Sequence, residues 1–476
     1  MSHGLKLRKI FLVIVMAGSL NAFASFLCFA EFNKLSIVHG FDDSSTTPNQ
    51  LIEGSDNLLY GTTQRGGQFD GGQIFRISKN GIGYEVLHSF GFVAVDGIHP
   101  LSRVTEGRDG ILYGTTNGGG KNFLGTIFKI NKDGSGYSVL YDFSEANIGY
   151  HPQGALLVVD DYLYGTTSNC SNSVCRGSGT IFRIKKDGTN FSNLYIFKAD
   201  RDASSEERKI GSRPEFGLVE GTDGFLYGTS QRALFKISKD GSDFEALHFF
   251  IDGIRYFYPV GDLVNKNGVL FGVTHSGGAS NMGFIYRINE DGTDFSIIWN
   301  FINGGLETPT QPDFGLLLDK NETLYGVAKN LIYRINTDGT NFSVLPATAK
   351  RLRGRMVLSG TNSALIQGSD GSLYGVSYFN SPCQPVETSG NIYSLKSSIE
   401  IIFDWAESTY PHYFPSHEET QFLTPWSYRY YPATEIYLGI NGDNNGIYVL
   451  GSTFGSSPVF IDKEDSVYGL IAASCE

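Results

Sequence analysis

Side chains able to do acid–base, nucleophilic or metal chemistry are scattered along this chain and do not form a recognised motif. No Gly-x-Ser-x-Gly sequence marks a nucleophilic serine, and no His-Glu-x-x-His marks a zinc protease. Gly118–Lys121 has the glycines of a phosphate loop, but Asn122 follows the lysine and a strand pattern replaces the expected helix. Asn441–Gly446 offers calcium-like oxygens without the distal glutamate of an EF-hand loop. We therefore predict no catalytic residue, no metal site and no cofactor.

Four residues are candidates for ligand binding instead: Arg65, Asn117, His275 and Tyr378. Each lies in a segment whose length and charge vary between otherwise similar stretches of the chain. Loops on a rigid scaffold are where binding residues concentrate, although exposed loops also vary by neutral drift. Whether these four share a surface depends on the elements that carry them.

Those elements form a repeat, because one phrase, Leu-Tyr-Gly-Thr-Thr or a near copy, occurs seven times. Its aromatic residue falls at Tyr60, Tyr113, Tyr164, Tyr227, Phe271, Tyr325 and Tyr374. Residues 100–143 show the whole unit, with strands predicted over 100–105, 111–116, 125–130 and 137–143. Asp-Gly pairs fill the turns, where glycine and Asp tolerate positive φ. Four antiparallel strands recurring roughly every 50 residues predict a β-propeller.

The strand count predicts how the ring closes. The first three strands of the unit occur seven times, and the last set spans 364–366, 373–376 and 391–395. The fourth strand first occurs at 34–41, ahead of any complete unit, and none follows the last set. We therefore expect an all-β, seven-bladed propeller over residues 32–396, closed by an N-terminal strand that completes the last blade and removes an exposed edge. An open array or two sandwiches are the alternatives.

The meander also predicts which face binds a ligand. Loops between strands two and three lie on the same face as the links between blades, and these are the segments that vary. His99 and His151 share the position before a proline, and a cation recurs in the third strand. The cations are Arg76, Lys129, Arg183, Lys236, Arg287 and Arg334. Because repeats copy structural residues, we interpret both sets as structural; a ring of positive charge is the alternative for the cations.

The wording of the repeat, Tyr-Gly-Thr-Thr, two glycines and then Gly-Thr-Ile-Phe, resembles the bacterial GloVer tandem repeat over residues 32–395. That family is found in secreted proteins with variable surface anchors. Its motif is a scaffold signature without assigned catalytic residues. The resemblance therefore implies the fold and export, and it implies no particular chemistry.

The N-terminus also predicts export. Lys6, Arg8 and Lys9 precede an apolar run and the small residues of Ala22–Ala24, which indicates a signal peptide over 1–24, with cleavage as late as residue 30 as an alternative. An uncleaved anchor is a further alternative, and no other segment reaches membrane-spanning length. Four mature cysteines allow three pairings. We expect a local disulfide between Cys170 and Cys175 and a second between Cys383 and Cys475.

After residue 398 the pattern changes. Residues 401–407 predict a short amphipathic helix, 428–450 predict a small antiparallel sheet, and a terminal helix is predicted from Lys463. We expect a small, aromatic-rich α+β domain over 399–476, which resembles a domain of unknown role in other bacterial secreted proteins. Its aromatic residues would suit sugar rings if exposed, or a core if buried.

The charge balance limits the partners. A net charge of −12 opposes nucleic acid binding, which requires clustered cations. We predict an exported, monomeric, non-catalytic binding or scaffold protein at the cell surface, outside the cell or in the periplasm, with no membrane span in the mature chain. Its expected partner is a polysaccharide or a surface protein. A carbohydrate-active hydrolase or lyase on the same scaffold is the alternative, and a purely structural surface protein is the third.

Overall fold

A computed structural model describes residues 34–396 with internal gaps, and five strands between residues 427 and 469. The gaps are 42–45, 94, 146–148, 170–177, 199–202, 253–254, 305–307, 330, 346–350, 353–354, 357–362 and 379–389. Leu35–Leu395 forms one compact unit. The predicted signal peptide, the helix over 401–407 and the four cysteines Cys170, Cys175, Cys383 and Cys475 lie outside the described residues.

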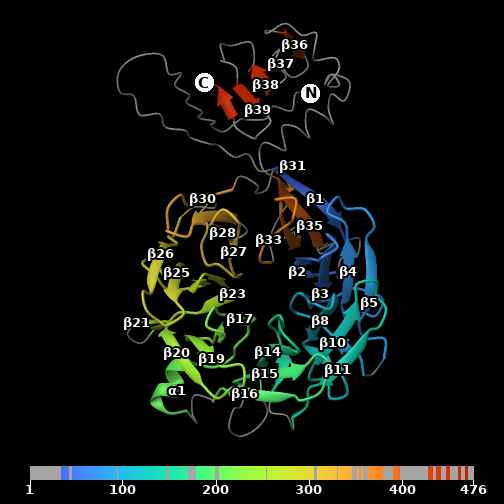
Figure 1. The fold of residues 1–476 in the computed structure, drawn as a ribbon, viewed down its shortest axis with the longest axis vertical. Coiled ribbons are helices and arrows are strands. Elements are labelled where there is room, and N and C mark those ends of the chain that lie inside the picture. The colour runs from blue at the N-terminus through green and yellow to red at the C-terminus, as the bar shows by residue number, and fades with distance from the viewer. Residues whose placement is uncertain are drawn as a thin grey trace. The chain divides into compact units, whose positions relative to one another are not determined.

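Leu35–Leu395 folds into seven antiparallel sheets arranged in a ring, here called blades 1 to 7 in chain order (Figure 1). The first strands are β2 (Pro48–Glu53), β7 (Thr105–Glu106), β13 (Leu157–Val159), β17 (Val219–Glu220), β23 (Pro259–Lys266), β27 (Leu317–Leu318) and β33 (Ile366–Gln367). The second strands are β3 (Leu59–Thr63), β8 (Ile111–Thr116), β14 (Tyr162–Asn169), β18 (Leu226–Thr229), β24 (Val269–Thr274), β28 (Thr323–Ala328) and β34 (Leu373–Tyr378).

The outer half of each blade follows the same order. The third strands are β4 (Gln73–Ile77), β10 (Thr126–Asn131), β15 (Thr180–Lys185), β19 (Ala233–Ile237), β25 (Phe284–Asn289), β29 (Leu331–Asn336) and β35 (Gly390–Lys396). The fourth strands are β5 (Glu85–Ser89), β11 (Ser138–Asp142), β16 (Ser192–Ile196), β20 (Phe244–Phe249), β26 (Ser296–Asn300), β30 (Ser343–Val344) and, from the other end of the chain, β1 (Lys34–Gly40).

The N-terminal strand closes the ring as predicted. β1 lies beside β35 in the sheet of blade 7, and the backbone N–H of Phe41 donates to the carbonyl of Gly390 at 2.9 Å. Blade 7 is also joined to blade 1, where the backbone N–H of Ser369 donates to the Glu53 carboxylate at 2.6 Å. The sequence prediction of a seven-bladed, N-terminally closed propeller is therefore confirmed.

The tyrosine, the glycine and the second threonine of the repeated phrase each make a structural contact in blade 1. The Tyr60 hydroxyl donates to the Asp56 carboxylate of the preceding turn at 2.7 Å. Gly61 is required because a Cβ there would overlap the ring of Phe75 on the next strand. Thr63 accepts from the backbone N–H of Gln73 at 3.2 Å, which fixes the loop that follows. The tyrosine–aspartate bond recurs in blades 2, 4 and 7, and a Cβ at the glycine would also overlap the third-strand aromatic ring in the other six blades.

The core lies in the wedges between neighbouring blades. In one wedge Leu59 and Phe75 of blade 1 pack on Tyr374 and Ile392 of blade 7, all nearly inaccessible. Around the outside, an aromatic ring from six of the seven fourth strands stacks on an aromatic ring of the next blade, as His88 does on Tyr137 at 3.6 Å between ring centroids. Burial of this kind is the main stabilising term in such a fold.

Two of the recurrent third-strand cations, Arg76 and Arg183, make structural contacts with the next blade. Arg76 pairs with Glu85 of the adjacent strand at 2.7 Å and also donates to the carbonyl of Lys132 in blade 2 at 2.9 Å. Arg183 makes the corresponding contact with the carbonyl of Lys239 in blade 4 at 2.8 Å. These side chains tie a blade to its neighbour.

The first strands depart from the prediction because side chains replace the expected ladder. Only Thr105–Glu106 of the predicted 100–105 segment pairs as a strand. The carbonyl of Pro100 instead accepts from the Asn49 side chain at 2.7 Å, and that of Ser102 accepts from Thr62 at 2.8 Å. Pro100 also has no N–H to give to a ladder.

Smaller elements decorate the ring. They are the helix α1 (Ser205–Ile210), the strand β12 (Tyr150–Pro152), which pairs with β14, and three two-stranded pairs: β6 (Gly97–Ile98) with β9 (Gly118–Gly119), β21 (Ile251–Asp252) with β22 (Arg255–Tyr256), and β31 (Arg351–Leu352) with β32 (Arg355–Met356).

The C-terminal segment contains one antiparallel sheet. Its strands, in order, are β36 (Ser427–Tyr431), β37 (Ile436–Ile440), β38 (Gly446–Leu450), β39 (Val459–Asp462) and β40 (Val467–Gly469). The predicted terminal helix from Lys463 is wrong, because Val467–Gly469 pairs with Val459–Ile461 as a strand. The alternation of valine and aromatic residues across this segment fits a strand better than a helix.

Two side chains from opposite blades meet on the axis of the ring. The Arg103 guanidinium of blade 2 donates to the Asp262 carboxylate of blade 5 at 2.6 Å and to the Gln50 side chain of blade 1 at 2.9 Å. Asp262 also accepts from the backbone N–H of Gly217 in blade 4 at 2.8 Å. Four blades are thus joined through this one pair.

Candidate functional site

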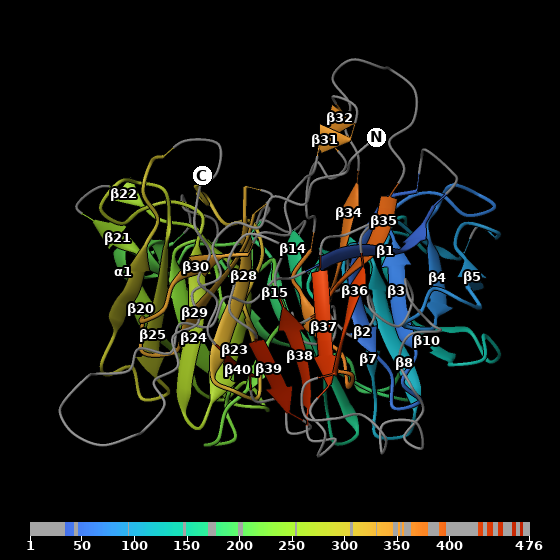
Figure 2. The same ribbon diagram turned by 90° about the horizontal axis from the view of Figure 1, so that it is seen from above.

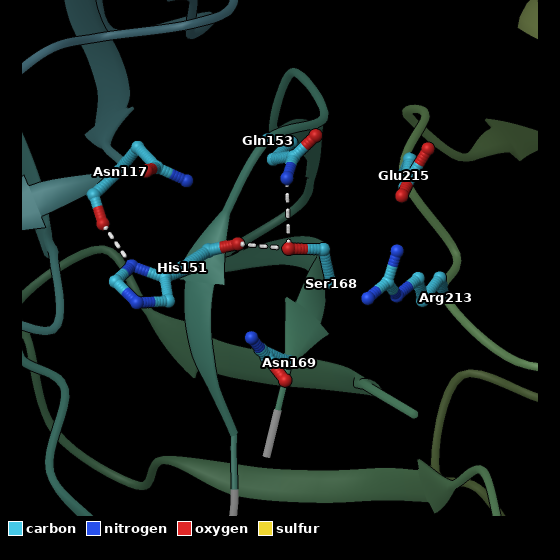
Figure 3. Close-up of a pocket in the computed structure, with 7 residues that line it drawn as sticks. All are labelled: Asn117, His151, Gln153, Ser168, Asn169, Arg213 and Glu215. Carbon is cyan, nitrogen blue, oxygen red and sulfur yellow. Dashed lines mark hydrogen bonds between the residues drawn. The ribbon is translucent and has the colours of Figure 1, made fainter. Parts of the chain in front are cut away.

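The loops between strands two and three and the links between blades lie on one face of the ring, which we call the variable-loop face. Seen at right angles to the view of Figure 1, the blade strands run between the two faces (Figure 2). A pocket of about 170 Å³ opens on the variable-loop face where blades 2, 3 and 4 meet. Its lining residues are Asn117, His151, Gln153, Ser168, Asn169, Arg213 and Glu215 (Figure 3).

Three structural elements supply the lining. Asn117 follows β8 of blade 2, and Ser168 and Asn169 end β14 of blade 3. β12 of blade 3 carries His151, and it pairs with β14 so that Tyr150 lies opposite Asn169. Gln153 directly follows Pro152, which ends β12, and Arg213 and Glu215 flank Pro214 in the link that precedes β17 of blade 4. The pocket therefore needs three consecutive blades to exist.

A repeated backbone device sets the position of His151 and Arg213. Both precede a proline and adopt positive φ, 57° and 51°. The backbone N–H of His151 donates to the carbonyl of Leu124 at 3.0 Å, and that of Arg213 donates to the carbonyl of Ser178 at 2.6 Å. Positive φ is costly for such residues, so the hydrogen bonds to the preceding loop must hold it.

Hydrogen bonds fix several of the lining side chains (Figure 3). His151 Nδ1 lies 2.6 Å from the carbonyl oxygen of Asn117. The Gln153 amide donates to Ser168 Oγ at 2.8 Å, and Ser168 Oγ donates to the carbonyl of His151 at 3.0 Å. Orientation is thereby set before any ligand arrives.

The lining of the pocket includes one carboxyl group, that of Glu215, and one guanidinium, that of Arg213. Burial raises the pKa of the Glu215 carboxyl above its usual value, and the nearby Arg213 guanidinium only partly opposes this shift. The lining is otherwise made of amides, a hydroxyl and an imidazole, which can donate and accept hydrogen bonds.

The geometry of Ser168 does not favour nucleophilic catalysis. An activated serine donates to the ring nitrogen of a base, whereas Ser168 donates to a backbone carbonyl. Among the described residues, no group of three or more His, Cys, Asp or Glu side chains is placed to hold a metal ion. The lining side chains can both donate and accept hydrogen bonds.

Comparison with known proteins identifies the scaffold. The profile of the Gloeobacter/Verrucomicrobia repeat matches residues 47–233 and 230–420. The chain belongs to this family. No curated protein matches this Gloeobacter/Verrucomicrobia repeat protein.

Solved structures share its fold. The extracellular domain of a protein described as a hybrid two-component system from B. thetaiotaomicron is 11% identical, with a TM-score of 0.50, over 94% of this chain and 48% of that chain. An oligogalacturonate lyase from Vibrio parahaemolyticus is also 11% identical, with a TM-score of 0.48, over 77% of this chain and 97% of that chain. The repeat protein thus spans about half the length of the first structure. At 11% identity, the likeness to the first structure shows the fold alone.

The structure brings one of the four predicted binding residues into the pocket of the repeat protein. Asn117 lines the pocket. Arg65 is exposed on the loop of blade 1, where its carbonyl accepts from Thr63 at 2.7 Å. His275 follows β24 of blade 5 and pairs with Asp313 at 3.0 Å. Tyr378 ends β34 of blade 7, and its side chain lies outside the described residues. These three belong to other blades, so they do not share the pocket with Asn117.

Sequence reasoning missed most of the lining of the pocket. It assigned His151 a purely structural role because His99 occupies the same position in the preceding blade. Both histidines do bind a carbonyl of the preceding loop, His99 at 2.9 Å, but only His151 lines the pocket. A signal was present directly after each link proline, where Leu101 is replaced by Gln153 and then by Glu215. A polar residue where another repeat has leucine indicates a role other than packing.

None of the helices within the described part of the chain has the length and apolar character needed to cross a membrane.

Proposed function

We propose that this repeat protein is exported and binds a neutral polysaccharide, without catalysis, through the pocket at blades 2 to 4. One observation carries the proposal: the pocket is lined entirely by hydrogen-bonding side chains, several of them held by bonds to one another. Sugar hydroxyls both donate and accept, so a fixed set of amides, a hydroxyl and an imidazole suits them.

The size and charge of the pocket limit which ligands it can bind. About 170 Å³ is below the roughly 300–1,000 Å³ of pockets that enclose drug-sized molecules, so one sugar ring at a time would enter. The single cation, Arg213, lies beside Glu215, and the chain carries a net charge of −12. Both features disfavour polyanions, whose binding depends on unneutralised positive charge.

Export is supported by the signal-like N-terminus and by structural similarity to an extracellular domain. An export signal of this kind fits a ligand found outside the cell. Fractionation of cells producing the full chain would locate the protein, and retention in the cytoplasm would contradict export.

Binding is tested with the mature chain against immobilised dextran, xylan, β-glucan and polygalacturonate. We expect retention by at least one neutral polymer, with weaker or no retention by polygalacturonate. Asn169→Ala should weaken binding about 3- to 10-fold, as expected for one lost hydrogen bond. Gln68→Ala, on the exposed loop of blade 1, is the matched control and should bind like wild type.

Two results would overturn the proposal. If the protein binds none of the neutral polymers, the proposed ligand class is wrong. If Asn169→Ala binds as tightly as wild type, the pocket is not the binding site. Release of reducing ends from any of the polymers would replace the binding function with the enzymatic alternative.

A further inference from the structure

Three loops on the variable-loop face share one backbone design. In blades 1, 2 and 5 the loop closes between two glycines, with N–H to carbonyl bonds of 3.1 Å each: Gly72 to Gly66, Gly125 to Gly119, and Gly283 to Gly277. Two residues before the closing glycine, each loop has a residue in the left-handed conformation. These residues are Asp70 (φ 54°), Phe123 (φ 60°) and Asn281 (φ 55°).

Phe123 of blade 2 differs from its counterparts Asp70 and Asn281, whose side chains accept hydrogen bonds from their own loops. The Asp70 side chain accepts from the backbone N–H of Gly66 at 2.9 Å, and that of Asn281 accepts from Gly277 at 3.0 Å. Asp and Asn tolerate this backbone region and here they also brace the loop. Phe123 can make no such bond, and this backbone region is unfavourable for a bulky side chain.

Phe123 gains no burial in return, since it is 71% exposed. A single exposed aromatic is ordinary on a protein surface. An exposed aromatic held in a strained backbone, at a position where the sister loops have a bracing Asp or Asn, needs another reason to be there.

The loop also places Phe123 next to the pocket. Asn117 belongs to the same loop, and the carbonyl of Leu124, the next residue, accepts from the backbone N–H of His151 at 3.0 Å. Only the Phe123–Leu124 peptide unit and this hydrogen bond separate the two residues. The Cα atoms of Phe123 and His151 therefore lie within about 11 Å of each other. That is roughly the span of two sugar rings.

We propose that Phe123 is a second subsite, on which the apolar face of a sugar ring stacks while a neighbouring ring occupies the pocket. The ligand is then an oligosaccharide segment of at least two residues, and this inference rests on the proposed function. The face of an aromatic ring is negative and apolar, which suits the polarised C–H groups on one side of a pyranose.

The decisive variant is Phe123→Asn. It restores the residue type of blade 5, so we expect the thermal midpoint to stay the same or rise. Affinity is measured with mono-, di-, tri- and tetrasaccharides of the neutral polymer that binds best. Wild type should gain affinity between one and three rings, and Phe123→Asn should lose about 10-fold for the trisaccharide while binding the monosaccharide as before.

Two further variants separate the aromatic contribution from general effects. Phe123→Tyr keeps the stacking surface and should keep the gain with length. Ile82→Asn removes an equally exposed apolar side chain, also 71% exposed, from a turn between strands three and four, and should change nothing.

The outcomes are distinct. If wild type binds no neutral glycan, the proposed function and this inference both fall. If wild type binds but shows no gain with length, or if folded Phe123→Asn keeps the gain, only the second subsite falls. Should Phe123→Asn not fold, loss of the gain in Phe123→Tyr would overturn the inference in the same way.

Discussion

At the scale of single residues, the position after each link proline decides what the variable-loop face presents. In blade 3 it is Gln153, bonded to Ser168, and in blade 4 it is Glu215, beside Arg213. In blade 6 it is Asp313, paired with His275. The same backbone thus offers an amide, a carboxyl group beside a guanidinium, or a carboxyl group beside an imidazole, depending on one side chain.

Glu215 makes a testable contribution to the pH dependence of stability. Its pKa in the folded chain is raised by burial, so the folded state binds this proton more tightly than the unfolded state. The free energy of unfolding therefore contains a favourable contribution that is complete below the ordinary carboxyl pKa and is lost as the pH rises through the raised value. Glu215→Gln should remove this contribution.

The measurement is urea denaturation of wild type and Glu215→Gln between about pH 4 and pH 7. We expect the difference in stability, variant minus wild type, to grow as the pH rises. A constant difference across that range would show that Glu215 has an ordinary pKa. Asp133→Asn serves as the comparison, because hydrogen bonds from Ser135 lower the pKa of the Asp133 carboxyl, so the same difference should not grow with pH in that variant.

At the scale of one element, blade 7 contains two buried tyrosines with opposite roles. The Tyr374 hydroxyl donates to the Asp370 carboxylate at 2.7 Å. The Tyr393 hydroxyl is buried and has no hydrogen-bond partner among the described residues. Blades 1 to 4 have phenylalanine at the position of Tyr393, in Phe75, Phe128, Phe182 and Phe235.

These two tyrosines should respond oppositely to the same substitution. Tyr374→Phe should lower the free energy of unfolding by about 1 kcal/mol, because a charge-assisted hydrogen bond is lost. Tyr393→Phe should raise it by about 1 kcal/mol or leave it unchanged, because an unsatisfied buried hydroxyl is removed. Chemical denaturation of both variants tests the pair, and an equal loss in both would mean that the Tyr393 hydroxyl is satisfied.

Strands whose hydrogen bonds come from neighbouring residues in the sequence were predicted correctly. Strands whose ends depend on contacts with another blade were not. Second and third strands follow from the Tyr-Gly-Thr-Thr and Ile-Phe phrases, since each is held by its own turn. The first strand of blade 2 was predicted too long because Asn49 and Thr62, from blade 1, take over its carbonyls. The pocket was missed for the same reason: no single repeat contains it, and His151 looks structural until Arg213 and Glu215 are placed beside it.

At the scale of the whole molecule, stability depends on closure of the ring by β1. Without this strand, β35 would present unpaired backbone groups as an exposed edge. A chain beginning at residue 46 should therefore unfold at a much lower temperature or associate into larger species, whereas one beginning at residue 32 should match the mature protein. Calorimetry and size-exclusion chromatography test this, and equal behaviour of both truncations would refute a role for β1.

The Arg103–Asp262 pair has a consequence for how any polymer can be engaged. Because this pair crosses the centre, from blade 2 to blade 5, the ring is not a tube that a chain could thread. A long glycan bound as proposed would lie across one face and dissociate from that same face. We therefore expect contacts with internal stretches of a polymer, made and broken from above, and no processive sliding along it.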